Sequence, residues 1–387
     1  MKKFISALLL AAMLLGITAC GTAQTGSDES KHLIGVLTYS LTDGETSSFR
    51  EYLENYIEAS FEDVDFLYSD NVTSKELELE AINAMSEAGV EGIMSFISFD
   101  LAAELDLCSS SEMYYMMASG TIADTEFEAN ADNPWFLGVI GPGRDIEYQA
   151  GYQMAAAFAD QGCRSYMIIT GGAAIGNEMH MARAEGMRDA LENKFGAELD
   201  FEPNQLQQTT TLSDGDLTVT LCPGYFSDEL ISEIKATYDA GNYDAVMSVL
   251  YVAPLADKVI DSTVGAVDCY DAENNELYQN GKLDYLTGKY ESIIAPSFAA
   301  MYNAVTGYAE QFRDSGRAFR LTQGFWTSAD KEDFDEKYAM SSGIALNAYS
   351  YDDLLEVIAV HNSNASLKDL QDLAEAYDFE SAQARRS

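Results

Sequence analysis

From His32 onward, short apolar runs of strand type alternate with longer segments of helical periodicity, and this alternation constrains the fold most strongly. Runs such as residues 33–37, 64–68 and 92–97 are typical of strands buried on both faces of a parallel sheet. Two such series follow one another, and no long linker separates them. The pattern predicts an α/β fold of two doubly wound parallel-sheet lobes, joined by short hinge segments, with a ligand cleft between them.

Each predicted lobe is assembled from more than one segment. We expect residues 32–143 plus 291–320 in the N-terminal lobe, and residues 144–290 plus part of 321–387 in the C-terminal lobe. The C-terminal helices within 351–377 are not assigned to either lobe. The exact hinge positions do not follow from the sequence.

Several expected elements bear on the site. A polar loop is expected at residues 38–48, before the first helix. The other elements that matter below are helices at 49–59, 255–262, about 296–314, 351–361 and 367–376, and strand fragments at 319–326 and 344–347.

The first nineteen residues have the composition of an export signal. Lys2 and Lys3 precede an apolar run at residues 5–15 that is too short to span a bilayer. The following Ile-Thr-Ala-Cys20 resembles the lipobox of bacterial lipoproteins, in which the cysteine becomes the acylated first residue. The resemblance implies a lipoprotein signal peptide at 1–19 and a lipid anchor, such as palmitate, on Cys20. A plain secretory peptide is the alternative, and the small polar residues 20–31 are expected to form a flexible tether.

The chain is strongly acidic, with 22 basic and 64 acidic residues and a formal charge of −42. Such a surface repels nucleic acid and anionic lipid headgroups, so neither is an expected partner. Beyond Cys20 the cysteines are Cys108, Cys163, Cys222 and Cys269, without a CxxC pattern. We expect buried thiols, although the spacing leaves open whether they form disulfides.

Arg183 stands in an unusual place in the stretch 163–193. A strand at 165–170 leads into a glycine loop, Asn177 is a candidate N-cap, and a helix runs to about residue 193. Arg183 lies on the apolar stripe of that helix, near the end whose dipole disfavours a cation. It is therefore either paired in the interior or directed over a strand end toward a ligand.

The loops at the carboxyl ends of the predicted strands supply the other candidate ligand-binding residues. They are aromatic and hydrogen-bonding, which suits a small polyhydroxylated or heterocyclic solute, and they call for no cofactor and no metal. Together with Arg183 the candidates are Tyr39, Thr42, Asp43, Phe49, Phe99, Asp100, His180, Tyr251, Asp268 and Tyr290.

Catalytic interpretations find little support. A Ser-His-Asp triad would need His180, yet no G-x-S-x-G elbow is present. The glycine loop at 171–176 lacks the Gly-Lys-Ser/Thr ending of a phosphate loop. A copper site at residues 179–181 is less expected than a core methionine and a satisfied histidine. Because carboxylates are so abundant, their pairs carry no information on hydrolysis. We predict that the chain is not an enzyme.

The order and spacing of several motifs resemble the type I periplasmic-binding-protein superfamily of ribose- and galactose-binding solute receptors. The matching segments are residues 34–37, 81–94, the Arg183-x-x-Gly-Met-x-x-Ala-Leu helix, 243–247 and 264–268. In that family the equivalent of Arg183 commonly contacts ligand, and the equivalent of Asp268 is often a ligand residue. The chain departs from the family at Leu250-Tyr251, where Asn-Asp is usual, and at residues 288–290, where a glutamine is usual. These departures leave nucleosides and other small solutes open beside sugars.

The resemblance implies a lipid-anchored solute-binding protein on the extracytoplasmic face of the cell membrane. It would act as a monomer in sugar transport and deliver its ligand to the permease subunits of an ABC importer. A sensory receptor that presents the ligand to a membrane protein, a nucleoside-binding lipoprotein and an extracellular hydrolase are the alternatives. The same fold serves in repressors, but the lipobox, the acidic charge and the lack of a helix-turn-helix argue against that role.

Overall fold

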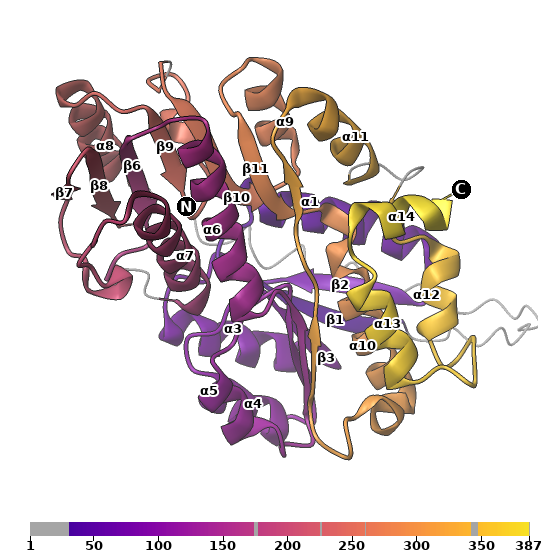
Figure 1. Ribbon diagram of the computed structural model, residues 1–387. Coiled ribbons are helices and arrows are strands. Elements are labelled where there is room, and N and C mark those ends of the chain that lie inside the picture. The colour runs from indigo at the N-terminus through magenta and orange to yellow at the C-terminus, as the bar shows by residue number, and fades with distance from the viewer. Residues whose placement is uncertain (1–30, 174–176, 225–226, 260, 342–346, 387) are drawn as a thin grey trace, which may run out of the picture. The chain divides into compact units, whose positions relative to one another are not determined.

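A computed structural model describes residues 31–173, 177–224, 227–259, 261–341 and 347–386. The predicted signal peptide, Cys20 and nearly all of the tether lie outside these residues, as do residues 344–346 of an expected strand fragment. The described residues form two sheets with helices packed on them (Figure 1). The prediction of an α/β fold with two parallel-dominated sheets is confirmed.

The first sheet contains only parallel neighbours among the described strands, in the order β12-β5-β4-β3-β1-β2. The strands are β1 (His32–Leu37), β2 (Val64–Tyr68), β3 (Gly92–Ser95), β4 (Tyr114–Ala118), β5 (Phe136–Gly141) and β12 (Phe319–Thr322). Strand β12 follows β6 to β11 of the second sheet along the chain, so the chain returns to the first sheet after building most of the second. The predicted lobe boundary at residue 320 falls inside this strand.

The second sheet has the order β13-β11-β10-β9-β6-β8-β7. Its inner neighbours are parallel, whereas β7 and β13 are antiparallel edge strands. The strands are β6 (Ser165–Thr170), β7 (Thr210–Asp214), β8 (Leu217–Pro223), β9 (Ala245–Ser248), β10 (Thr263–Cys269), β11 (Tyr285–Lys289) and β13 (Trp326–Ser328). The polar edge strand β7 has no apolar run, so the sequence pattern did not predict it.

The α-helices are distributed along the whole described chain. They are α1 (Gly44–Tyr52), α2 (Glu58–Ser60), α3 (Lys75–Glu87), α4 (Leu101–Ser110), α5 (Asp124–Asn130), α6 (Arg144–Asp160), α7 (Glu178–Phe195), α8 (Asp228–Ala240), α9 (Ala272–Gln279), α10 (Ala295–Asn303), α11 (Lys331–Ser341), α12 (Tyr351–Val357), α13 (Leu367–Glu375) and α14 (Phe379–Arg386). Asn177 caps α7, as predicted, because its side chain accepts from the His180 N–H.

Three expected helices differ from the structure. The first begins at Gly44 rather than residue 49, because the Asp43 side chain accepts from the Thr46 N–H and caps it. The stretch 255–262 contains no regular helix in its described part. It has a 3₁₀ turn at Ala253–Leu255 instead. Pro254 lies at the start of this turn, where its missing N–H costs no hydrogen bond. The helix expected at 296–314 loses its regular form after Asn303, and Gly307 there adopts a φ of 93°.

Alternate residues along the strands of the first sheet pack into different hydrophobic cores. On β4, Tyr115 and Met117 pack with side chains of α3, α4 and α5, whereas Met116 and Ala118 pack on the opposite face with those of α1 and α10. Because helices cover both faces, the strand ends and the loops that follow them are the places left for a ligand.

Helices α6 and α7 lie side by side (Figure 1) and pack backbone against backbone. A Cβ atom on Gly151 would lie 1.9 Å from the Arg183 carbonyl oxygen, and one on Gly186 would lie 2.0 Å from the Tyr148 carbonyl oxygen. Only glycine permits this approach. The close packing holds Arg183 directly beside α6.

Two buried carboxyl groups hold the loop between β3 and α4. Glu78 and Glu104 are both 0% exposed, and the Phe99 N–H donates to Glu78 Oε2 at 2.9 Å and to Glu104 Oε1 at 3.1 Å. The Ser98 and Tyr115 hydroxyls also donate to Glu104. Burial, together with the neighbouring Glu104 carboxyl, raises the pKa of Glu78 to about 9. Glu78 is therefore protonated at neutral pH.

We expect Gly186→Ala to destabilise the chain by about 1–3 kcal/mol, because the added methyl overlaps the backbone of α6. Urea unfolding followed by circular dichroism measures the change. Asn193→Ala, at an exposed position of the same helix, is the matched control and should leave stability unchanged or slightly raised. Equal midpoints for Gly186→Ala and the unmodified chain would contradict the close packing.

We expect Glu78→Gln to stabilise the chain at high pH. The unfolded chain releases the Glu78 proton near pH 4.5 and the folded chain near pH 9, so this group lowers the free energy of unfolding as pH rises between these values. Glutamine stays neutral and removes that loss, which is about 5 kcal/mol at about pH 8. Urea midpoints at about pH 5 and pH 8 test this. The exposed Glu80→Gln is the control, and an unchanged pH slope in Glu78→Gln would refute the raised pKa of Glu78.

Candidate functional site

Strand-end loops from both sheets meet at one place. Burial raises the pKa of the half-buried Tyr251. The nearby Glu273, Asp268 and Asp43 raise this pKa further, and the nearby Tyr39 adds a smaller rise. Tyr39 and Asp43 follow β1 of the first sheet, whereas Tyr251 and Asp268 belong to β9–β10 of the second. Four of the residues predicted from sequence are therefore neighbours in space.

Direct contacts join the two sheets beside these residues. Lys289, the last residue of β11, is 5% exposed and donates to Glu45 Oε1 at 2.7 Å and to the Ser119 carbonyl oxygen at 2.8 Å. The Asp271 carboxylate abuts Gly44, since a Cβ atom there would lie 1.9 Å from Asp271 Oδ2. The first turn of α1 is thus held against the ends of β10 and β11.

We call this region the inter-sheet cluster. It consists of Tyr39, Asp43, Glu45, Ser119, Arg183, Tyr251, Asp268, Asp271, Asn274 and Lys289, with Glu147 beneath it.

Arg183 lies in an interior ion pair, the first of the two alternatives that the sequence left open. Its side chain is 5% exposed, and its Nε donates to Glu147 Oε2 at 2.6 Å. One terminal nitrogen donates to the Val249 carbonyl oxygen at 2.7 Å. Burial raises the pKa of the fully buried Glu147, and the Arg183 charge opposes this rise. Because Val249 precedes the loop that carries Tyr251, Arg183 holds that loop in place.

The carboxylates of the cluster are held by neutral donors. Asp268 accepts from Asn274 Nδ2 at 2.7 Å, Asp271 from the Asn274 N–H at 2.7 Å, and Asp43 from the Thr46 N–H at 2.9 Å. Burial raises the pKa of Asp268 well above its ordinary value, and the Asp271 charge raises it further. Burial likewise raises the pKa of Asp271 to about 6 and that of Asp43 above its ordinary range. These groups are costly to ionise without a nearby cation.

Two of the predicted aromatic contacts lie in the core instead. Phe49 is 2% exposed and stacks on Phe96 at 5.1 Å, because the earlier start of α1 turns residue 49 toward the sheet. Tyr290 is 0% exposed and stacks on Trp326 at 3.9 Å. The structure does not bring either ring to the surface of the inter-sheet cluster.

The remaining predicted residues lie on separate elements. Phe99 is 46% exposed in the loop held by Glu78 and Glu104, and Asp100 caps α4 and pairs with Lys75. Thr42 is exposed directly before Asp43, and His180 is half-buried in the first turn of α7. Phe99 and Asp100 are consecutive and both donate a backbone N–H to Glu104 Oε1, and the ligand roles of all four residues stay predictions.

Sequence reasoning did not select Glu45, Glu147, Asp271, Asn274 or Lys289. Glu147 is one of 64 acidic residues, so its charge could not single it out. Lys289 had a usable signal, because a lysine at the end of an apolar strand needs a partner where it is buried. The Asp271-x-x-Asn274 spacing marks a helix N-cap, which says nothing about a ligand.

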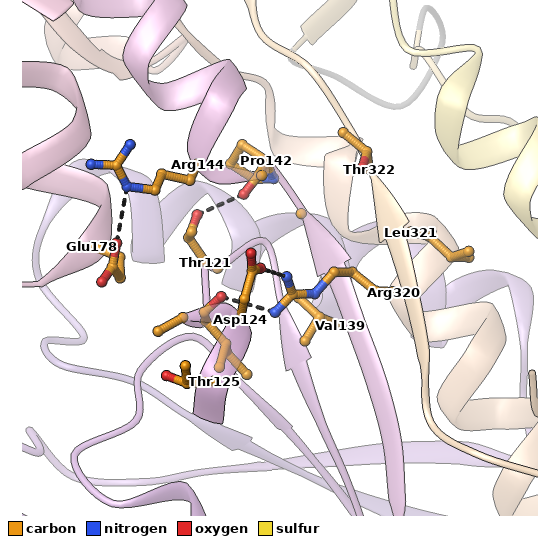
Figure 2. Close-up of a pocket in the computed structure, with 15 residues that line it drawn as sticks. Thr121, Asp124, Thr125, Val139, Pro142, Arg144, Glu178, Arg320, Leu321 and Thr322 are labelled. Atoms are coloured by element: carbon orange, nitrogen blue, oxygen red, sulfur yellow. Dashed lines mark hydrogen bonds and ion pairs between the residues drawn. The ribbon is translucent and has the colours of Figure 1, made fainter. Parts of the chain in front are cut away.

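A pocket of about 290 Å³ opens beside the cluster, at the ends of β4, β5 and β12. Figure 2 shows the Thr121 hydroxyl donating to the Pro142 carbonyl oxygen, at 2.6 Å, and Arg144 paired with Glu178 at 3.3 Å. Thr121 also lies 3.5 Å from Glu147 Oε1, so it forms the wall between this pocket and the buried ion pair. Arg320 in the pocket pairs with Asp124.

The described residues contain no group of three or more His, Cys, Asp and Glu placed to hold a metal. Cys108, Cys163, Cys222 and Cys269 are free and buried, as predicted. Over the same part of the chain, no helix combines the length and apolarity needed to cross a bilayer.

The fold resembles that of several solved binding proteins. A galactofuranose-binding protein aligns with a TM-score of 0.58 and 14% identity over 80% of this chain and 100% of its own. An ABC transporter solute-binding protein from Bacillus halodurans C-125, with bound myo-inositol, aligns with a TM-score of 0.58 and 15% identity over 81% and 99%. A transcription regulator of Lactococcus lactis aligns at 0.55 and 14% identity over 78% and 100%.

Sequence comparison alone finds no relative: no protein-family model and no curated protein matches the chain. The structural likeness nevertheless covers about four fifths of the chain and nearly the whole of each neighbour. The chain therefore has the two-sheet fold of the type I periplasmic sugar-binding proteins, as its motifs predicted.

Proposed function

We propose that the chain is an extracytoplasmic solute-binding protein that captures a small sugar-like ligand at the inter-sheet cluster and delivers it to an ABC importer. The observation that carries the proposal is the meeting of Tyr39 and Asp43 with Tyr251 and Asp268 from the other sheet. Tyrosine rings offer apolar faces for a sugar ring, and carboxylates accept strong hydrogen bonds from hydroxyls. Structural neighbours that bind galactofuranose and myo-inositol support this ligand class.

Because the ligand would contact both sheets, a partner protein could recognise the arrangement of the sheets that ligand binding stabilises. A ligand that contacts Asp43 and Asp268 together is bound only when both strand ends are close, so it stabilises that arrangement over a more open one. The Lys289–Glu45 ion pair and the Asp271–Gly44 contact already favour it. An importer that recognises the ligand-bound arrangement would then select loaded protein.

We assign Arg183 a positioning role at this site. Its Nε binds Glu147 and one terminal nitrogen binds the Val249 carbonyl oxygen, so it acts on the ligand through the loop that carries Tyr251. Removing one partner of such a buried pair leaves an uncompensated charge. A variant at Arg183 is therefore expected to lose stability as well as affinity.

A thermal-shift screen of the full-length chain tests the ligand class. We expect a sugar or polyol to raise the melting temperature, and Tyr251→Ala to weaken binding of that ligand at least about tenfold through loss of stacking. Tyr308→Ala, which removes an exposed tyrosine elsewhere, is the matched control. A shift by nucleosides alone would replace sugars by nucleosides, and conversion of the ligand to a product would refute a binding-only function.

The predicted anchor has its own test. We expect Cys20→Ser to move the protein from the membrane fraction to the soluble fraction of the cells and to abolish labelling by radioactive palmitate, because the acyl chains would have no attachment site. Cys108→Ser keeps Cys20 and is the control, since Cys108 is buried. Unchanged palmitate labelling of Cys20→Ser would rule out Cys20 as the lipid site.

A further inference from the structure

The inter-sheet cluster contains more carboxylates than cations. Its two cations are already used, Arg183 by Glu147 and Lys289 by Glu45. Within the described residues, no lysine or arginine lies within 4.0 Å of the carboxylates of Asp43, Asp268 or Asp271. Carboxyl groups are therefore left without a cation to stabilise their ionised forms where the two sheets meet.

An unsatisfied amide oxygen gives a second and independent observation. Asn274 is 1% exposed, and its Nδ2 donates to Asp268 Oδ2 at 2.7 Å and to the Cys269 carbonyl oxygen at 2.9 Å. Both of these neighbours are acceptors, so the amide cannot be reversed. Its Oδ1 is buried without a hydrogen-bond partner, in the side chain that contacts Asp268. Such a group is costly unless a donor arrives from outside the chain.

The Ser119 hydroxyl adds a third acceptor site. Ser119 is 3% exposed at the end of β4, and its carbonyl oxygen binds Lys289 Nζ. Its Oγ is buried without a partner in the described structure. The cluster thus offers carboxylate, amide and hydroxyl oxygens to a ligand, while both of its cations are engaged in ion pairs.

These surroundings select for a ligand that donates hydrogen bonds and carries positive charge. A neutral sugar supplies hydroxyl donors, but it brings no positive charge to stabilise the ionised forms of Asp268 and Asp271. A protonated amine supplies up to three donors and no acceptor, and it forms charge-assisted hydrogen bonds with carboxylates. The tyrosine rings of Tyr39 and Tyr251 add faces that attract a cation.

We propose that the ligand captured at the inter-sheet cluster is a polyhydroxylated solute with a protonated amine, as in amino sugars and aminocyclitols, whose ammonium group binds beside Asp268, Asp271 and Asn274 Oδ1. This inference rests on the proposed solute-binding function and narrows its substrate class. The hydroxyl groups of the ring remain for the tyrosines and for Asp43.

Calorimetric titration of the full-length chain at about pH 6.5, where such amines are protonated, provides the test. The probes are glucosamine and galactosamine, their neutral parents glucose and galactose, and the N-acetyl forms, which keep the ring and lose the charge. We expect an amino sugar to bind at least about tenfold more tightly than its parent and its N-acetyl form. Equal or tighter binding of the neutral forms overturns the inference and leaves the proposed function standing.

A charge-removing variant locates the ammonium group. Asp268→Asn keeps an acceptor for Asn274 but cannot become a carboxylate, so it should weaken amino-sugar binding at least about tenfold more than it weakens neutral-sugar binding. Asp271→Asn is the second variant, and Asp200→Asn, at an exposed position, is the control. An equal loss for charged and neutral sugars in both variants overturns the inference. Failure of every solute in the thermal-shift screen would instead refute the proposed function.

Discussion

The buried pair of Arg183 and Glu147 is the interaction on which the arrangement of the site depends. It joins α7 to α6, and a further hydrogen bond from Arg183 holds the Val249 carbonyl oxygen at the end of β9. Both helices approach closely enough for this only because Gly151 and Gly186 lack side chains. Breaking such a pair costs far more than the pair contributes, because one charge is then left in the interior. The pair therefore specifies one position for the Tyr251 loop.

A second pair, Lys289 with Glu45, joins the two sheets directly, and its surroundings differ from those of the first. Arg183 is enclosed by helices, whereas Lys289 reaches across to α1 and to the Ser119 carbonyl oxygen. Glu45 is partly exposed, so the attraction is weakened by solvent and is easier to break. The Arg183 pair suits a permanent part of one sheet, and the Lys289 pair suits a contact that forms and opens with a ligand.

Much of the fold and part of the site could be predicted from the sequence. Buried parallel strands appear as apolar runs, and the carboxyl ends of such strands mark the site, so Tyr39, Asp43, Tyr251 and Asp268 could be selected before the structure was known. The burial of Phe49 could not, because it depends on where α1 begins, and that was decided by the cap at Asp43. The partner of Arg183 could not be predicted either, because nothing in the sequence distinguishes Glu147 from the other acidic residues among the 64.

The fold by itself does not decide the ligand, since solute-binding proteins and a transcription regulator share it. The distinguishing property of this chain is the balance of charge at the strand ends. Where the receptor family that the sequence motifs resemble usually has an asparagine–aspartate pair after one strand and a glutamine near the last hinge, this chain has Leu250-Tyr251 and residues 288–290, which include Lys289. The tyrosine adds an aromatic face, and the lysine is consumed by Glu45. Asp268 and Asp271 have no paired cation in the described structure, so under the proposal a cationic solute supplies the charge that stabilises their ionised forms.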